Sequence, residues 1–262
     1  MNEILREFSA RLPSALGSEP VGVYLHGSLA VGDFDEASSD IDFIVVTDTE
    51  PTSAQVAGVR QMHTDLLSLP SPYSKRLEGS YFPRALLSGG EKVGVDPLWF
   101  FDGGTRTLGQ SICDNSWVVL WELHNCGVAV VGPEPKSFFG PVPVATLQRA
   151  VLSEMKAWTE RLASNPSSLN NPWNRSFVVL THCRMLETLE SGAVHSKAAS
   201  VRWSEAALPL RWSPLINRAL LGRKSVDGQV VRPDDEIEVT ETLAFVEYAM
   251  ARGCGSIQEK TT

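Results

Sequence analysis

The amino-acid sequence predicts an α+β protein in which a small mixed β-sheet with helices is followed by an α-helical bundle. Two observations predict this fold class. Before about residue 140, apolar runs are short, rich in β-branched residues and separated by turns, as in a mixed α/β layer. After it, apolar residues recur at helical spacing almost to the end of the chain. We therefore expect two domains, 1–142 and 143–262.

The first domain shows helical and strand patterns in turn. Three stretches have the spacing of amphipathic or buried helices: 3–16, 52–69 and 114–126. Four short apolar runs bounded by turn residues are predicted strands: 21–25, 42–47, 77–82 and 128–131. Asp114 or Asn115 is the expected N-cap of the last helix, since both side chains accept hydrogen bonds from backbone N–H groups.

The second domain reads as helices separated by breaking residues. Five helical stretches are expected: about 144–164, 173–191, 197–207, 213–223 and 236–252. The breaks fall at Pro166, Gly192, Pro209 and the segment 224–235. This order predicts a helical bundle.

The composition is that of a soluble globular protein. The chain has 262 residues, of which 43% are hydrophobic and 21% charged, and its formal net charge is −8. The acidic balance disfavours a nucleic-acid partner but suits a small cationic ligand. No apolar run is long enough for a bilayer and the N-terminus lacks a signal-peptide pattern, so a cytoplasmic protein without a membrane partner is expected. A monomer is expected as well. The four cysteines form no C-x-x-C spacing that would indicate zinc or redox chemistry.

The segment 27–47 contains the motif that indicates chemistry. Gly27-Ser28 ends a strand, where glycine permits close backbone approach and exposed N–H groups suit a phosphate oxygen. Asp40 and Asp42 flank Ile41 at the start of the next strand, and residues i and i+2 of a strand share a face. Two neighbouring carboxylates repel each other unless a hard cation such as Mg²⁺ lies between them. Either half alone is common in solvated strand ends; the combination predicts metal and phosphate binding.

This arrangement resembles the nucleotidyltransferase superfamily whose palm is shared with DNA polymerase beta. The resemblance implies that Gly27 and Ser28 hold the triphosphate of ATP and that Asp40 and Asp42 hold Mg²⁺. It also implies a third acidic residue on a neighbouring strand. Glu78 is the only carboxylate in the predicted strand 77–82. Asp96 is the alternative for this role.

The second half carries short motifs in the order found in the aminoglycoside (3″)(9)-adenylyltransferases. These are 127–133, 141–143, 177–184, Gly192, Ser196-Lys197 and Trp203. The resemblance covers residues 21–222, approximately. Each motif alone is loosely defined, but all of them occur in the same order along the chain. It implies that Glu78 is the catalytic base and that Arg184 and Lys197 contact the phosphates. A solvated helix face is the other interpretation of the two basic residues.

The implied activity is Mg²⁺-dependent transfer of AMP from ATP to a hydroxyl of an aminoglycoside or aminocyclitol antibiotic. Members that handle streptomycin have a Trp before the 114–126 helix and an Asp where this chain has Asn174. The Tyr that the family places near the nucleotide falls around Leu220. These departures favour spectinomycin, unless Trp99 or Trp173 replaces the missing aromatic face. The alternatives are a nucleotidyltransferase acting on a protein or RNA, and a catalytically silent nucleotide-binding module.

Overall fold

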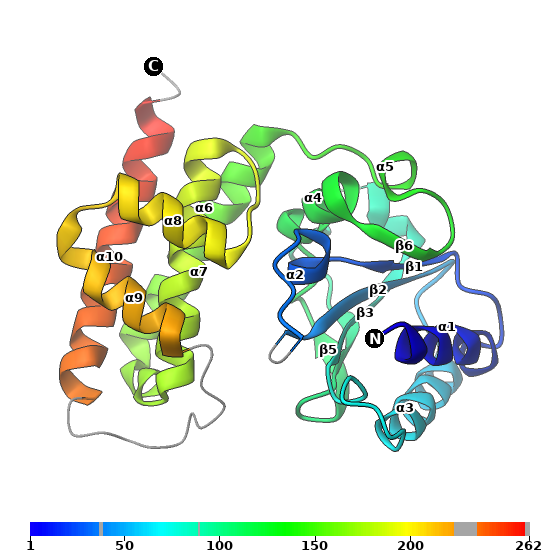
Figure 1. Cartoon of the computed structure of the whole chain (residues 1–262). Coiled ribbons are helices and arrows are strands. Elements are labelled where there is room, and N and C mark those ends of the chain that lie inside the picture. Colours follow the sequence, from blue (N-terminus) through cyan, green and yellow to red (C-terminus); the bar gives the residue numbers. More distant parts are fainter. Residues whose placement is uncertain (37–38, 89, 223–234, 260–262) are drawn as a thin grey trace. The chain divides into compact units, whose positions relative to one another are not determined.

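The computed structural model describes residues 1–36, 39–88, 90–222 and 235–259 (Figure 1). The chain divides into two compact units, Met1–Val142 and Pro143–Thr262. Unit 1 contains the sheet and unit 2 is helical, so the α+β fold class predicted from the sequence is confirmed.

In the described part of unit 1, a six-stranded sheet has the order β5-β4-β3-β2-β1-β6. Its strands are β1 (Gly22–Leu25), β2 (Ile41–Thr47), β3 (Leu77–Pro83), β4 (Leu98–Asp102), β5 (Thr107–Ser111) and β6 (Val128–Val131). The β2–β3 pair is parallel and the other pairs are antiparallel, which makes the sheet mixed. Strands β4 and β5 had no prediction. The edge strand β5, TLGQS, buries little and has no apolar run to reveal it.

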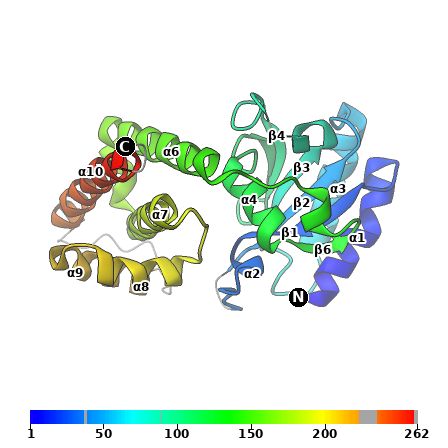
Figure 2. The same cartoon turned by 90° about the horizontal axis from the view of Figure 1, so that it is seen from above.

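Helices cover both faces of this sheet (Figures 1 and 2). Helices α1 (Asn2–Leu16) and α3 (Ser53–Leu67) lie side by side on one face, where Phe8 packs against Phe43 with ring centroids 4.7 Å apart. The other face is covered in part by α4 (Trp117–Cys126) and the short α5 (Pro135–Phe138), whose Phe138 stacks on Tyr24. The four-residue α2 (Gly27–Ala30) follows β1, and the 3₁₀ turn η1 (Arg84–Ser88) follows β3.

The described part of unit 2 is a bundle built around one buried helix. Its helices are α6 (Val144–Ser164), α7 (Pro172–Ser191), α8 (Lys197–Ala207), α9 (Ser213–Gly222) and α10 (Asp235–Glu259), with 3₁₀ turns η2 (Pro166–Asn170) and η3 (Leu210–Trp212). Helix α7 packs against the other four, as Figure 2 shows, and is buried around most of its circumference. The five helices expected from the sequence are present. Helix α7 begins one residue earlier than expected, and α10 begins one residue earlier and ends seven residues later, at Glu259. The expected break at 224–235 lies, up to residue 234, outside the described residues.

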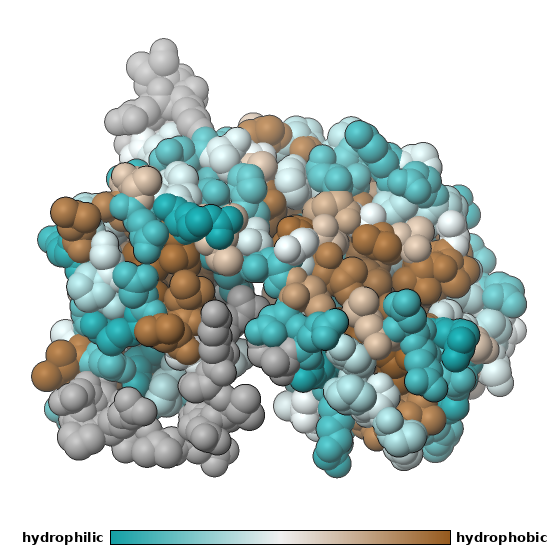
Figure 3. All heavy atoms as spheres, in the orientation of Figure 1, coloured by the Kyte–Doolittle hydropathy of each residue, from teal (hydrophilic) through white to brown (hydrophobic). Residues whose placement is uncertain are grey.

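Within the described residues, no helix combines the length and the apolar character that a bilayer span requires. On the face shown in Figure 3, hydrophobic residues of unit 1 gather around β1 and β6, and the edge strand β6 exposes Val128 and Val131.

Candidate active site

Three carboxylates lie in a row across the sheet of unit 1. Asp42 on β2 is the register partner of Glu78 on β3, and Glu78 is the partner of Asp102 on β4. Directly opposed residues project from the same face, so the three side chains share the face opposite α1 and α3. Asp40 precedes β2 and is exposed, but its charge still acts on Asp42 and Glu78.

The crowding of like charges changes how these groups titrate. The pKa of Asp42 is raised to about 6, because burial and the neighbouring carboxylates raise it more than the charge of His26 lowers it. Burial likewise raises the pKa of Glu78 to about 8, together with the charges of Asp40, Asp42 and Asp102 among others. Glu78 thus holds a proton near neutral pH in the absence of a cation. A divalent cation would relieve the repulsion that raises both pKa values.

The Gly27-Ser28 turn lies directly against Asp42. Gly27 has φ +62°, a conformation that favours glycine, and a Cβ added there would be 2.0 Å from Oδ2 of Asp42. The backbone N–H of His26 donates to the carbonyl oxygen of Asp42 at 3.1 Å. Ser28 is half-buried, and its hydroxyl has no hydrogen-bond partner among the described residues. The fold therefore joins the phosphate-turn motif to the Asp-x-Asp motif.

Three buried residues belong to this site that sequence reasoning missed: His26, Asp114 and Glu122. Burial lowers the pKa of His26, but its hydrogen bond with Glu122 and the charges of Asp42, Asp114 and Glu122 raise it to about 9. Burial raises the pKa of Asp114, against the lowering effects of His26 and of the 2.7 Å hydrogen bond from Ser80. One sequence signal was present: Glu122 is the only carboxylate in the apolar helix WVVLWELHNC.

The N-cap predicted for α4 is wrong. Ser116 caps this helix, because its hydroxyl accepts from the backbone N–H of Val119 at 3.2 Å. Asp114 instead belongs to the carboxylate site. Asn115 is fully buried and donates to the carbonyl oxygens of Lys92 and Asp96.

Asp96, the alternative to Glu78, has a different environment. Its carboxylate forms an exposed ion pair with Lys92, with Nζ 3.6 Å from Oδ2. Asp96 is absent from the charges that shift the pKa values of Asp42 and Glu78. The geometry favours Glu78 as the third carboxylate.

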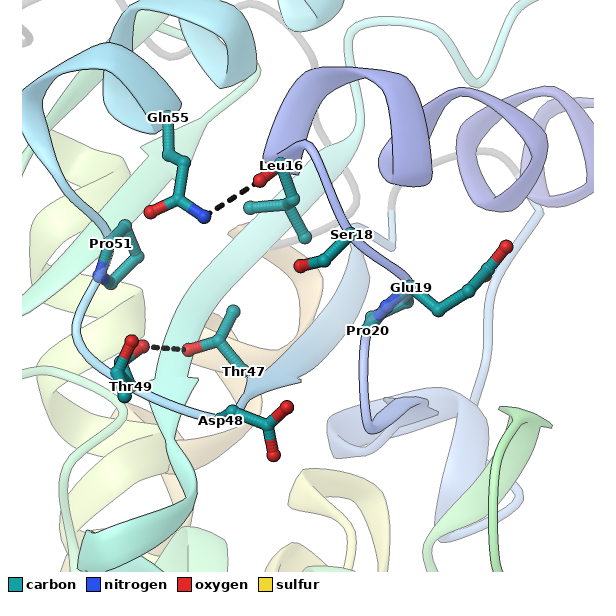
Figure 4. Close-up of a pocket in the computed structure, with 9 residues that line it drawn as sticks. All are labelled: Leu16, Ser18, Glu19, Pro20, Thr47, Asp48, Thr49, Pro51 and Gln55. Carbon is teal, nitrogen blue, oxygen red and sulfur yellow. Dashed lines mark hydrogen bonds between the residues drawn. The ribbon is translucent and has the colours of Figure 1, made fainter.

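A small hollow in unit 1 is unconnected with this site. Its volume is about 40 Å³, and Figure 4 shows Gln55 reaching across its rim to the carbonyl oxygen of Leu16. The hollow lies beside Thr47, at the end of β2 away from Asp42. Five residues of strand span about 17 Å, so nothing bound in the hollow would touch the carboxylates.

Comparison with known proteins decides the family. A model of the nucleotidyltransferase domain matches residues 1–78, which contain the turn and all three predicted carboxylates. A model of the aminoglycoside adenylyltransferase C-terminal domain matches residues 137–251. The chain belongs to the aminoglycoside (3″)(9)-adenylyltransferase family. It is a nucleotidyltransferase, as predicted.

Relatives in this adenylyltransferase family are distant. An aminoglycoside (3″)(9) adenylyltransferase of Rhizobium radiobacter is 28% identical over 141 residues, covering 53% of this chain and 48% of that protein, so the match spans about half of each. A spectinomycin 9-adenylyltransferase of Staphylococcus aureus is 24% identical over 251 residues, a match that covers 88% of this chain and 87% of that protein. The crystal structure of a spectinomycin adenyltransferase from Enterococcus faecialis, with ATP and spectinomycin, shares the fold. Its TM-score is 0.70 at 15% identity, and the match covers 97% of this chain and 99% of that one.

The two basic residues expected at the phosphates of the adenylyltransferase lie in unit 2. Arg184 is half-buried on α7, and Lys197 is the first residue of α8. Nζ of Lys197 lies 4.7 Å from the ring centroid of Phe177, a cation–π distance. Both side chains are half-buried. Their contact with phosphate remains a prediction.

The structure shows the contacts of Asn174, Trp99 and Trp173, the three residues on which the expected choice of antibiotic depends. Asn174 donates its side-chain N–H to the carbonyl oxygen of Ser168 at 2.9 Å, so it serves the local fold of α7. Trp99 is the register partner of Tyr81, on the face opposite Glu78 and Asp102, and packs into the core. It therefore does not supply an aromatic face beside Glu78. Trp173 is half-exposed and stacks on Phe177.

Proposed function

We propose that this protein transfers AMP from ATP to a hydroxyl of an aminoglycoside or aminocyclitol antibiotic, releases pyrophosphate and thereby confers resistance. The observation that best supports this proposal is that Asp42 and Glu78 are register partners on neighbouring strands, beside the Gly27-Ser28 turn. Nucleotidyl transfer needs a turn that binds phosphate, a carboxylate that binds a cation and a base. The Gly27-Ser28 turn, Asp42 and Glu78, whose pKa is raised, can fill these roles.

Asp40 and Asp42 are the proposed ligands of Mg²⁺. In the described residues, no three His, Cys, Asp or Glu side chains form a complete metal cage. Mg²⁺ commonly takes one or two carboxylates plus substrate phosphates, so this donor set fits it. When bound, the ion neutralises charge on the phosphate oxygens.

The protein's own groups supply the remaining chemistry. Glu78 accepts the proton of the acceptor hydroxyl, whose oxygen then forms a bond to the α-phosphorus. The bond from the α-phosphorus to the bridging oxygen breaks, and pyrophosphate leaves. Arg184 and Lys197 balance the charge of the leaving group. A base is most effective when its pKa lies near the working pH, which suits Glu78.

Spectinomycin is the proposed substrate. It is a small, rigid dication that needs carboxylates and a nearby base. The guanidinium groups of streptomycin bind best where a carboxylate can pair with them through two hydrogen bonds and an aromatic ring can stack on them. Asn174 is neutral and engaged with Ser168, and Trp99 faces the core. Two of the relatives act on spectinomycin by name, which supports this choice.

The test is pyrophosphate release by the full chain with ATP, Mg²⁺ and a panel that includes spectinomycin and streptomycin, with mass spectrometry of the product. We expect AMP-modified spectinomycin and a higher kcat/KM for spectinomycin than for streptomycin. Efficient modification of streptomycin alone would overturn the substrate proposal. ATP binding without modification of any drug would favour a protein or RNA acceptor or a silent binding module.

A further inference from the structure

We propose that Glu122 and His26 are positioning residues that hold the Gly27-Ser28 turn in the geometry that binds the triphosphate. The inference rests on the proposed function for the identity of the ligand. It assigns a role to a helix that the nucleotidyl-transfer motifs do not include.

One carboxylate oxygen of Glu122 serves two groups of the turn. Oε2 accepts from the backbone N–H of Gly27 at 3.3 Å and lies 3.3 Å from Nδ1 of His26. Glu122 is 96 residues away from His26 in the chain, so this contact ties α4 to the end of β1. Carboxylate hydrogen bonds of this kind are stronger than neutral ones.

The opposite side of the same turn is fixed by Asp42. Its carbonyl oxygen accepts from the N–H of His26, and its carboxylate occupies the space where a side chain of Gly27 would begin. The turn is therefore held between the proposed metal ligand on one side and Glu122 on the other. A shift of α4 or loss of its carboxylate would move Gly27 and Ser28 relative to Asp42.

The burial of Glu122 and His26 gives their contact an energetic cost that calls for hydrogen-bond partners. Glu122 is 4% exposed and His26 is 6% exposed. A carboxylate in the interior is costly unless it is paired and hydrogen-bonded, whereas leucine would serve helix packing at no such cost. An apolar residue at position 122 could serve neither Nδ1 of His26 nor the N–H of Gly27, so the carboxylate is the group that fixes the turn.

The experiment measures the affinity of the full chain for ATP with Mg²⁺ by calorimetry, together with KM for ATP and for the antibiotic. The variants are Glu122→Leu, which removes the acceptor, and Glu122→Gln, which keeps volume and one acceptor oxygen but no charge. Glu160→Gln on α6, in an exposed pair with Lys156, is the matched control. Thermal unfolding reports stability separately.

We expect Glu122→Leu to raise the Kd for ATP by about tenfold and Glu122→Gln by about threefold, the range for the net contribution of one hydrogen bond. The KM for the antibiotic and the control variant should not change. Combining Glu122→Gln with His26→Gln should raise Kd by less than the product of the two single effects, because both act through one turn.

A lower melting temperature with an unchanged Kd for ATP in Glu122→Gln would show a merely structural role and overturn the inference, even if Glu122→Leu does not fold. The proposed function fails differently. If the wild-type chain modifies no antibiotic but binds ATP, and the variants bind it more weakly, the positioning role stands. If the variants bind ATP normally while spectinomycin is modified, the function stands and the positioning role is wrong.

Discussion

At the scale of single residues, the site is defined by how many carboxylates the fold gathers around one positive side chain. Burial and mutual repulsion raise the pKa values of Asp42, Glu78 and Asp114, while His26 lowers those of Asp42 and Asp114. Such an arrangement is unfavourable for an empty protein and favourable for one that binds a cation. Each carboxylate can therefore be tested by removing its charge while keeping its volume.

The change Asp42→Asn should leave the fold intact and abolish transfer. The amide has the same volume but no charge for a metal ion. We expect activity below about one per cent of wild type, equivalent to about 2.7 kcal/mol of lost transition-state stabilisation. Pyrophosphate release measures the loss, and circular dichroism must show native helix content. Asp48→Asn, one residue past the far end of β2, is the control and should retain activity. If Asp42→Asn were as active as this control, Asp42 would have no role in metal binding.

The change Glu78→Gln should separate binding from chemistry. ATP should still bind with Mg²⁺, since the turn and the Asp pair remain, but transfer should fall by about 10²–10⁴, the usual contribution of a positioned base. Calorimetry with ATP and single-turnover kinetics measure the two effects. Asp96→Asn should leave both unchanged. The reverse pattern, with weak ATP binding by Glu78→Gln and lost transfer by Asp96→Asn, would assign the base to Asp96.

At the scale of elements, the site depends on a β–α–β unit. Because α3 connects β2 to β3 as a crossover, the two strands run parallel and their N-terminal ends lie side by side. Asp42 and Glu78 are each the second residue of their strand, so this arrangement brings them together. The turn after β1 reaches the same end of the strands, because β1 runs antiparallel to β2.

The turn itself can be tested with a pair of glycines. Gly27→Ala and Gly17→Ala both place a Cβ at positive φ, +62° and +70° respectively, which costs about 1–2 kcal/mol in each case. Only at Gly27 does the new Cβ meet the carboxylate of Asp42, since Gly17 has open space around it. The unfolding midpoint should therefore fall in both variants and further in Gly27→Ala, whereas ATP affinity and transfer should fall only for Gly27→Ala. Equal activity in the two variants would contradict the close approach of the turn to Asp42.

At the scale of the whole molecule, stability should depend on pH through these buried groups. In the folded protein the pKa of Glu78 is raised from 4.5 to about 8 and that of His26 from 6.5 to about 9. A raised pKa gives stability that is lost as pH rises through the folded value, because the folded state keeps a proton that the unfolded chain has released. The pKa values of His63 and His182 are lowered to about 3 and about 4, so they affect stability only below about pH 6.5.

The free energy of unfolding should therefore fall between about pH 6.5 and 9 in the absence of divalent cations. Denaturant titrations at constant ionic strength with a chelator measure this dependence. The variant Glu78→Gln should show a shallower slope because it cannot titrate, and excess Mg²⁺ should flatten the wild-type curve. A flat curve for the wild-type chain with chelator would mean that the carboxylates are not crowded as described.

The sequence by itself determined the features that depend on near neighbours in the chain. Helical periodicity identified the bundle from Val144 onward, and short apolar runs located β1, β2, β3 and β6, because local burial imposes the 3.6- and 2-residue periods. The Gly27-Ser28 and Asp40-x-Asp42 motifs were likewise visible, since their chemistry lies in short spacings. The fold class followed from the periodicity and the family from the resemblance that the motifs carry, and both are confirmed.

Only the tertiary structure decided which distant residues meet. The register of β2 on β3 selected Glu78 over Asp96 as the neighbour of Asp42, and no local pattern encodes register. The same holds for Glu122, whose partner is 96 residues away, and for Trp99, whose strand parity turns it to the core. Asp114 was mistaken for a helix cap because a polar residue before a helix has the same sequence signature whether it caps the helix or points into a site. Side-chain identity is local information, whereas the electrostatic environment of a buried charge is the sum over everything that the fold packs around it.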